Sequence, residues 1–328
     1  AGYLPFDRNP QTENPENGMI STANNLSTMT PITPIGILTG YFRPDDRAAR
    51  IYELLAEREK WDMEGLKKIQ TDTRLFSGPA MTRAILDVLT LQKSGFSDQE
   101  RKGLEALTAW DGFMGTDSIG GTIFQFTTYH IVKQALEPHI GPDLLKAYLN
   151  QVDYWSYLKE FLPSDNNTIT GRTGTAPTTK EAIVLAGFKD AVRELVGKYG
   201  VDPAKWNWGA VHTIEFAHAM GKKKPLDFFF NIGPFPSPAE FTSVNKLKSN
   251  IGDHDYKVTS IPSTRRLIDC LDPDNTWSIL PTGNSGNFKS PFYKDQAEMY
   301  ITGQYRKVLF TEEQYMTDDA KVLRMVPQ

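Results

Sequence analysis

The stretch Asn14-Pro15-Glu16-Asn17-Gly18-Met19-Ile20-Ser21-Thr22-Ala23-Asn24-Asn25 decides how the rest of the chain is interpreted. Asn-Pro and Asn-Gly are turn signals, because Pro fixes φ whereas Gly and Asn tolerate positive φ. Residues 20–23 are predicted to form one short strand that ends in two side-chain amides. An Asn at the end of a strand can donate an N–H to a developing oxyanion in acyl transfer. Such an Asn also commonly forms an Asx-turn or a helix cap, so residue type alone leaves both interpretations open.

Length and composition describe an ordinary globular chain. It has 328 residues, of which 39% are hydrophobic and 23% are charged, so it can bury a sizeable core. The net charge is −4 and the densest basic run is Lys222-Lys223-Lys224, so no nucleic-acid partner is expected. No apolar stretch approaches the ~20 residues of a membrane-spanning helix, so no membrane partner is expected either. The sequence starts at Ala1, without Met, and is expected to be a piece of a longer protein.

The character of the sequence changes at residue 44. Residues 1–43 are rich in Pro, Gly, Asn and Thr and contain only short strand candidates. Asp45 or Asp46 is then expected to cap a helix that places Ala48, Ile51, Leu54 and Leu55 on one face. The same three-and-four spacing predicts helices over about residues 62–71, 79–92, 97–110, 122–136 and 144–162, the third of them opened by a Ser97/Glu100 capping box.

A further helix is predicted after residue 177. Thr178 and Glu181 have the spacing of a capping box, and a broad apolar stripe follows until Gly197 and Gly200 end the helix. Beyond Trp206 the pattern is mixed, with short strands expected over residues 241–244, 256–261 and 277–280 and a last helix over 291–301. The prediction is an α+β chain with a strand-bearing segment (1–43), a helical block (44–203) and a mixed strand/helix segment (204–328).

Several residues with possible chemistry have a simpler structural interpretation. His212-x-x-Glu215-x-x-His218 would point its ends apart on a helix, so capping and packing are favoured over a metal site. Gly283-Asn284-Ser285-Gly286 lacks the last glycine of a nucleophile elbow and is interpreted as a glycine-rich turn. Asp272 and Asp274 have no following Glu at calcium-loop spacing and are expected in a solvated loop. Cys270 lies in an apolar run and is expected to be a buried, inert thiol, which leaves the cellular compartment open.

Motifs along nearly the whole chain resemble the penicillin acylase (penicillin amidase) family. The resemblance begins with Leu4-Pro5-Phe6, Asn9-Pro10, Asn14-Pro15, Gly18 and Asn24-Asn25 and continues with the pair Asp46-Arg47. Later matches are Gln70-Thr71-Asp72-Thr73, Trp110-Asp111-Gly112, Trp208-Gly209 with His212 and His218, Thr242-Ser243-Val244-Asn245, Ser263 with Arg265 and Asp269, Leu280-Pro281-Thr282-Gly283-Asn284-Ser285-Gly286, Ser290-Pro291-Phe292-Tyr293-Lys294-Asp295-Gln296, and Gly303 with Tyr305. Each motif alone is weak, whereas their order over more than 300 residues is specific.

The resemblance implies a fold and a reaction. Members are N-terminal nucleophile hydrolases with an αββα core, in which a precursor cuts itself and the new N-terminal Ser attacks an amide carbonyl with its own α-amino group as base. Asn24 matches the Asn that completes the oxyanion hole, and Arg47 matches an arginine near the acyl-transfer site. This chain would be the C-terminal portion of the β chain, without the nucleophile and inactive alone.

The same resemblance implies partners and a location. The partners would be the N-terminal remainder of the precursor (the α chain and the first part of the β chain) and a small N-acyl substrate, and the location would be periplasmic or extracellular. Some members bind calcium, but residues 26–46 are acidic only at Asp45 and Asp46, so no metal or other cofactor is assigned. The alternative is a non-catalytic binding or structural domain that keeps the fold, and an upstream Ser at a self-cleavage junction would separate the two.

Overall fold

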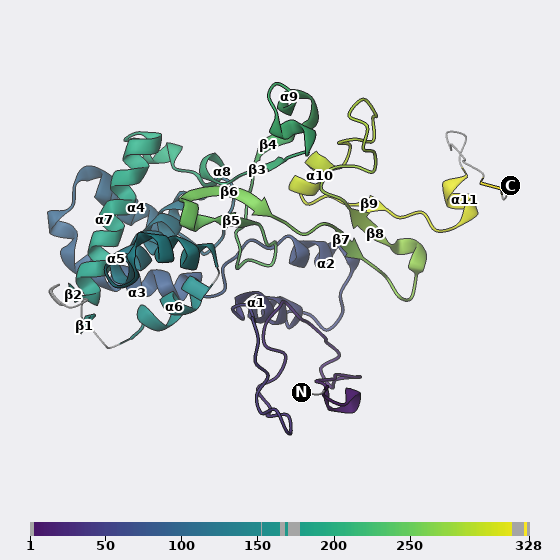
Figure 1. Ribbon diagram of the computed structural model, residues 1–328, viewed down its shortest axis with the longest axis horizontal. Helices are drawn as coiled ribbons and strands as arrows, with labels where there is room; N and C mark the ends of the chain where they lie inside the picture. Colours follow the sequence, from purple (N-terminus) through teal and green to yellow (C-terminus); the bar gives the residue numbers. More distant parts are fainter. Residues whose placement is uncertain (1–2, 152, 165–167, 170–177, 317–324, 327–328) are drawn as a thin grey trace. The chain divides into compact units, whose positions relative to one another are not determined.

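The computed structural model describes residues 3–151, 153–164, 168–169, 178–316 and 325–326 (Figure 1), so Ala1 lies outside the described residues. The chain divides into two compact units, each made of separated segments. The first unit comprises Ala1–Glu59, Asp72–Ile214 and Pro234–Ile261, and the second comprises Lys60–Thr71, Glu215–Gly233 and Pro262–Gln328. The predicted boundaries after residues 43 and 203 stay a prediction.

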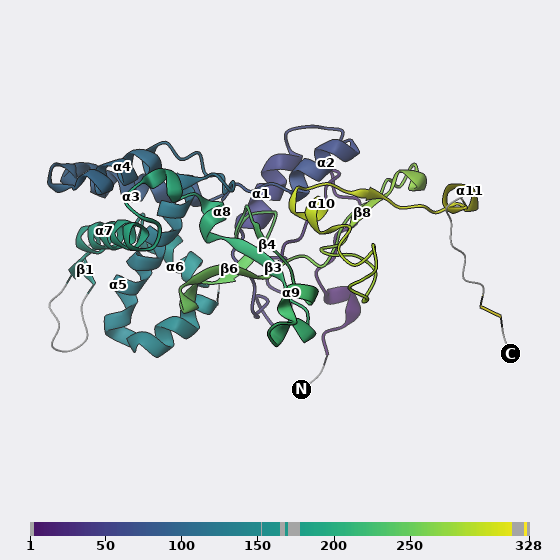
Figure 2. The same cartoon turned by 90° about the horizontal axis from the view of Figure 1, so that it is seen from above.

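Helices dominate the first unit. They are α1 (Asp46–Leu55), α3 (Gly78–Gln92), α4 (Asp98–Thr108), α5 (Ile119–Asn150), α6 (Asp153–Phe161), α7 (Lys180–Tyr199) and the short α8 (Trp208–Val211). Helices α5 and α7 lie side by side, as the two views in Figures 1 and 2 show. A Cβ on Gly187 of α7 would lie 2.8 Å from the Ile131 side chain of α5, so a glycine is needed for this close approach.

The core of this unit is a continuous cluster of buried apolar side chains. Its largest fully buried members include Trp155, Trp206, Phe124, Phe126 and Phe188. Burying one such side chain stabilises the fold by roughly 1.5–3 kcal/mol. The amphipathic spacing along α3, α4 and α7 therefore matches the faces that the structure buries, and the predicted helices are confirmed there.

The predicted helix caps are confirmed only in part. Ser97 and Glu100 form the predicted capping box at α4. The second predicted box is wrong: Thr179 rather than Thr178 is the N-cap residue of α7, and its side chain accepts the N–H of Ala182 without a reciprocal bond from Glu181. Neither Asp45 nor Asp46 caps α1, since both carboxylates are taken by Lys159, at 2.6 and 3.0 Å.

Helix α5 is longer than predicted. It continues past residue 136 to Asn150, with non-helical dihedral angles at Gly141, where φ is 77°. Pro138 and Pro142 flank this break, so the backbone leaves the helical path between them. The predicted helix over 144–162 is divided between the end of α5 and α6.

The described part of the second unit contains short helices and a three-stranded sheet. The helices are α2 (Met63–Gln70), α9 (Asp227–Phe230), α10 (Ala297–Ile301) and α11 (Glu312–Tyr315). Strands β7 (Arg265–Leu267), β8 (Trp277–Ile279) and β9 (Arg306–Lys307) form an antiparallel sheet, with Leu267 opposite Trp277 and Trp277 opposite Lys307. The ammonium group of Lys67 on α2 lies 4.0 Å from the centre of the Trp277 ring.

The remaining strands of the described residues form two-stranded sheets. Strand β5 (Lys248–Asn250) pairs with β6 (Asp255–Ser260), β1 (Thr168–Ile169) pairs with β2 (Thr178–Thr179), and β3 (Thr213–Phe216) pairs with β4 (Ile232–Pro236). The α+β class is therefore confirmed, as are the strands predicted over 256–261 and 277–280. None of the helices within the described ranges is long and apolar enough to cross a membrane.

Other local predictions are wrong. Residues 20–22 belong to no strand and Ala23 lies in a bend, and residues 241–244 form a turn. The predicted helix over 291–301 is limited to α10, because turns occupy residues 291–296. Cys270 is exposed rather than buried, since it follows β7 in a loop where Leu271 is also exposed.

Candidate active site

Asn24 lies at the surface of the first unit, directly after the buried Ala23. Its φ is 63°, in the left-handed region that Asn tolerates better than most residues. The backbone carbonyl of Asn24 accepts the N–H of Arg43 at 2.8 Å, which closes the loop between the two residues. The backbone alone therefore fixes the position of Asn24, independently of its side-chain contacts.

Arg47 holds the side chain of Asn24. Arg47 stands in the first turn of α1, and its Nη2 donates to the Ala23 carbonyl oxygen at 2.7 Å and to Asn24 Oδ1 at 2.8 Å. A guanidinium has no acceptor, so it can only bind the oxygen of the amide, and the orientation of Asn24 follows. Asn24 is an exposed residue, and within the described part of the chain its Nδ2 forms no hydrogen bond. The structure thus brings the two predicted site residues together and leaves an N–H free to donate.

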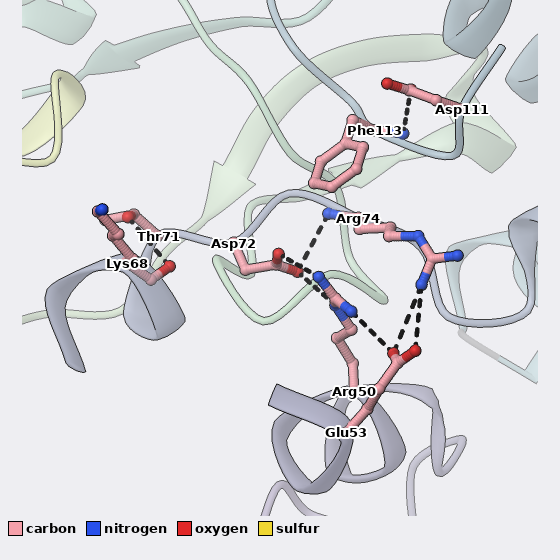
Figure 3. A network of polar contacts seen from close by, with 8 residues as sticks. All are labelled: Arg50, Glu53, Lys68, Thr71, Asp72, Arg74, Asp111 and Phe113. Carbon is pink, nitrogen blue, oxygen red and sulfur yellow. Dashed lines mark hydrogen bonds and ion pairs between the residues drawn. The ribbon is translucent and has the colours of Figure 1, made fainter. Parts of the chain in front are cut away.

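The base of α1 is anchored by a second arginine (Figure 3). Arg50 is buried and binds Asp72 through two parallel hydrogen bonds, Nε to Oδ1 at 3.1 Å and Nη2 to Oδ2 at 2.8 Å. Its Nη1 reaches Glu53 at 2.8 Å, and Arg74 lies 3.4 Å from the same carboxylate. Two-pronged pairing of this kind adds geometric specificity, so it fixes the helix that carries Arg47. The hydrogen bond to Asp72 has the largest effect on the pKa of Arg50. Together with the bond to Glu53 it raises this pKa above its usual range.

Positive charge gathers around Arg47. Burial, together with the nearby cation Arg43, lowers the pKa of Arg47. Burial also lowers the pKa of Lys246 and Lys248, and Arg43 adds to the effect at both. Arg47 Cζ and Lys246 Nζ each lie 6.0 Å from the centre of the Phe241 ring. Among the described residues none of these four cations forms a salt bridge, so the region is a positive cluster without a directly paired anion.

Glu240 is the buried acid beside this cluster, and no sequence motif indicated it. It precedes Phe241 in the turn that replaces the predicted strand, and only 5% of the residue is exposed. Its carboxylate accepts the backbone N–H of Thr242 at 2.5 Å and the Thr242 hydroxyl. Burial raises the pKa of Glu240 to about 7, and these hydrogen bonds and that of Phe241 oppose the rise. The charge interaction with Arg47 was invisible in a sequence where nearly 200 residues separate them.

Another cluster of ionisable groups lies between α5 and α7. Glu194 accepts hydrogen bonds from His130 Nε2 at 2.8 Å and from His254, and Lys198 Nζ lies 2.7 Å away. Burial opposes ionisation, but the bonds to His130, His254 and Lys198 lower the pKa of Glu194 well below its usual range. These contacts tie the β5–β6 hairpin to the helices and identify a structural cluster.

The residues considered for a metal occupy separate places. His212 is buried at the end of α8, with Nδ1 2.6 Å from the Tyr256 carbonyl oxygen. Glu215 lies in strand β3 and accepts from Asn231 Nδ2 at 3.0 Å, so the assumed helical spacing is wrong. The ring of His218 stacks on Phe230 with centres 5.0 Å apart, a packing role that agrees with the prediction.

Metal-binding geometry is absent from the described residues. No group of three or more His, Cys, Asp or Glu side chains there could hold an ion. The two acids of residues 26–46, Asp45 and Asp46, are both paired with Lys159 and do not form a calcium site. Ser285 lies in irregular backbone between bends at Asn284 and Gly286, and a Cβ on Gly283 would lie 2.2 Å from the Phe292 carbonyl oxygen.

Comparison with known proteins identifies a family for this chain. The family model described as penicillin amidase matches residues 1–317. The chain is 22% identical over 331 residues to acyl-homoserine lactone acylase QuiP of Pseudomonas aeruginosa, covering 93% of this chain and 39% of that protein. It is 24% identical to penicillin G acylase of Escherichia coli, covering 91% and 37%, and 24% identical to the penicillin acylase 2 proenzyme of Pseudomonas sp., covering 90% and 37%.

A solved structure agrees with the sequence comparisons. The thermostable penicillin G acylase from Alcaligenes faecalis superimposes with a TM-score of 0.50 at 13% identity, covering 99% of this chain and 60% of that one. The chain therefore shares this fold, and it spans about two fifths of the length of the curated relatives it matches. Because the family model matches nearly the whole chain, this protein belongs to the penicillin amidase family.

Proposed function

We propose that this chain is the C-terminal part of a penicillin-acylase-like amide hydrolase and supplies one donor of its oxyanion hole. The observation that carries the proposal is the Arg47–Asn24 contact at 2.8 Å. An oxyanion donor must present N–H groups, and Asn24 does so because Arg47 occupies its oxygen. Within the described chain no Asx-turn or helix cap uses this amide, which favours the catalytic interpretation.

In the proposed reaction the nucleophile comes from an upstream part of the same precursor. In the proposed mechanism an upstream N-terminal Ser attacks the amide carbonyl, and its α-amino group takes the hydroxyl proton. The carbon becomes tetrahedral and negative charge collects on the former carbonyl oxygen. Asn24 Nδ2 donates to that oxygen, which stabilises the transition state by about 3–4 kcal/mol. The α-ammonium group then gives this proton to the departing nitrogen as the C–N bond breaks, and water hydrolyses the acyl-enzyme.

The remainder of the precursor is the first partner in this proposal. The curated relatives are more than twice as long as the matched segment, and the name of one of them, a proenzyme, indicates a precursor. The α chain and the first part of the β chain would supply the Ser, a second oxyanion donor and most of the acyl pocket. A periplasmic or extracellular location is part of the same proposal.

The substrate class follows from the chemistry shared by the relatives. An acyl-homoserine lactone and a penicillin both contain a linear N-acyl amide, which is the bond that acylases of both names act on. We therefore expect an N-acyl amide as substrate. The acyl-chain preference would be set by the upstream part of the protein.

The direct test is hydrolysis by the full-length gene product. The upstream coding sequence is read for a Ser at a self-cleavage junction, and the purified protein is assayed with N-acyl amides of increasing acyl length. Maturation into two chains and release of free amine support the proposal. A full-length protein without a junction Ser, and without amine release, would instead identify a domain that keeps the fold for binding or structure.

A further inference from the structure

We propose that Glu240 is a positioning residue for the acyl-transfer reaction: its buried carboxylate holds the Arg47 guanidinium, and through it the Asn24 amide. The inference rests on the proposed function and extends it by one residue. Glu240 does not touch the reacting atoms in this account. It acts through Arg47, whose Nη2 binds Asn24 Oδ1 at 2.8 Å.

The turn around Glu240 is built to hold a carboxylate in one orientation. Thr242 donates to the Glu240 side chain from both its backbone N–H and its hydroxyl. The Glu240 N–H donates to Ser243 Oγ at 3.1 Å, and the Ser243 hydroxyl donates back to the Glu240 carbonyl oxygen at 2.9 Å. Ala239, just before, has a φ of 66° and accepts the indole N–H of Trp208 at 2.8 Å. A strained, fully bonded turn of this kind is typical of sites where geometry matters.

Arg47 interacts electrostatically with two nearby cations, Arg43 and Lys246, and with one buried acid, Glu240. Arg43 and Lys246 both repel it, and burial strengthens that repulsion. Glu240 attracts it through space, with the Phe241 ring beneath the guanidinium at 6.0 Å. The two groups form no salt bridge within the described chain, so the attraction orients Arg47 without removing its bond to Asn24.

The arrangement makes the amide sensitive to protonation of Glu240. Three ionisable groups on the packed elements interact with it: Arg47 and Asp46 on α1 and Tyr154 on α6. Burial raises the pKa of Glu240 to about 7, so the carboxylate gains its charge near neutral pH. Below that pH the attraction on Arg47 disappears, the repulsion from Arg43 and Lys246 remains, and Asn24 loses its restraint.

The test is a pH profile of the full-length enzyme with a chromogenic N-acyl nitroanilide. Glu240→Gln keeps the shape and can accept the Thr242 bonds, but it never carries charge. We expect kcat at pH 8 to fall about 3- to 30-fold with little change in KM. The fall of kcat on the acid side of the pH profile that is due to Glu240, the acid limb, should disappear in this variant. Glu105→Gln, an exposed carboxylate on α4, is the matched control and should keep the native profile.

A second variant keeps the test decisive if Glu240→Gln does not fold. Thr242→Val removes only the hydroxyl that favours the ionised carboxylate, so the acid limb should move to higher pH. An acid limb that stays in place in the folded variants would overturn the inference.

The role of Glu240 is separated from that of Asn24 by a double-mutant cycle. Glu240→Gln is introduced into the Asn24→Ala enzyme, where a residue that acts through Asn24 has nothing left to position. We expect its effect to vanish there. An equal loss in both backgrounds would refute the positioning role while leaving Asn24 in the oxyanion hole. A lack of effect of Asn24→Ala alone would instead refute the proposed function.

Discussion

Arg47 Nη2 lies 2.8 Å from Asn24 Oδ1, although the two residues are 23 positions apart in the sequence. The contact decides which end of the amide is available, because a guanidinium binds only oxygen. Asn24 has two properties that its position requires: it tolerates a φ of 63°, and it carries an N–H that can face a substrate. The structural and the chemical interpretations of this Asn are therefore compatible.

Replacing Arg47 by Lys should impair catalysis in the full-length enzyme. Lysine keeps the charge but lacks the planar group that reaches both the Ala23 carbonyl and Asn24. We expect kcat/KM to fall about 10- to 100-fold, the range for losing a charge-assisted hydrogen bond. Steady-state kinetics measure this, with Arg83→Lys on the exposed side of α3 as control. Equal kcat/KM values for the native enzyme and Arg47→Lys would show that the contact has no catalytic role.

Removing Arg50 should destabilise the protein much more than removing a surface arginine. Arg50→Ala leaves the buried Asp72 without its partner, which costs about 3–5 kcal/mol. Arg193, whose side chain is 75% exposed, forms a 2.6 Å pair with Asp190 within α7. Arg193→Ala should cost less than about 1 kcal/mol. Urea unfolding of the two variants measures the difference, and similar losses would contradict the anchoring role of Arg50.

Glu240 should lower stability at alkaline pH, because folding raises its pKa. The folded state binds the proton more tightly than the unfolded state, whose value is near 4.5, so stability is lost as pH rises through about 7. This loss amounts to roughly 3 kcal/mol, and Glu240→Gln should abolish it. Unfolding free energies at pH 5 and pH 8 measure the effect. Parallel pH dependences for the variant and the native protein would contradict it.

His212 should have the opposite pH dependence. Burial lowers its pKa from 6.5 to about 4, so the unfolded state binds more protons, and stability is lost as pH falls from about 6.5 to about 4. The change is roughly 3 kcal/mol. His212→Asn can still donate to the Tyr256 carbonyl without titrating, so its stability should fall less steeply over this range. Unfolding measured at several pH values tests this, and an equally steep fall in the variant would be evidence against a buried neutral histidine.

The sequence was sufficient to predict the helices because their cause is local. The apolar stripes of α3, α4 and α7 and the Ser97 cap follow from spacing and residue type within about four positions. Asn24 and Arg47 were found by family motifs rather than by periodicity. The Cys270 environment was mispredicted because apolar neighbours such as Leu271 are themselves exposed in this loop.

Features that depend on distant contacts could not be predicted. The strand expected over 241–244 is a turn because Thr242 and Ser243 bond back to Glu240 rather than to a neighbouring strand. Asp45 and Asp46 resemble helix caps in sequence, but Lys159 on α6 takes both carboxylates. The burial of Glu240 near Arg47 arises only once α1 and this turn pack together.

The most direct test of the account is the acylation rate of the full-length enzyme carrying Asn24→Ala. Burst kinetics with a chromogenic N-acyl nitroanilide separate acylation from the later hydrolysis. Asn17→Ala, which removes an exposed amide used in a local turn, serves as the matched control. We predict that Asn24→Ala lowers the acylation rate by about 10²- to 10³-fold while the protein stays folded. An acylation rate equal to that of the control would contradict the claim that this amide stabilises the oxyanion.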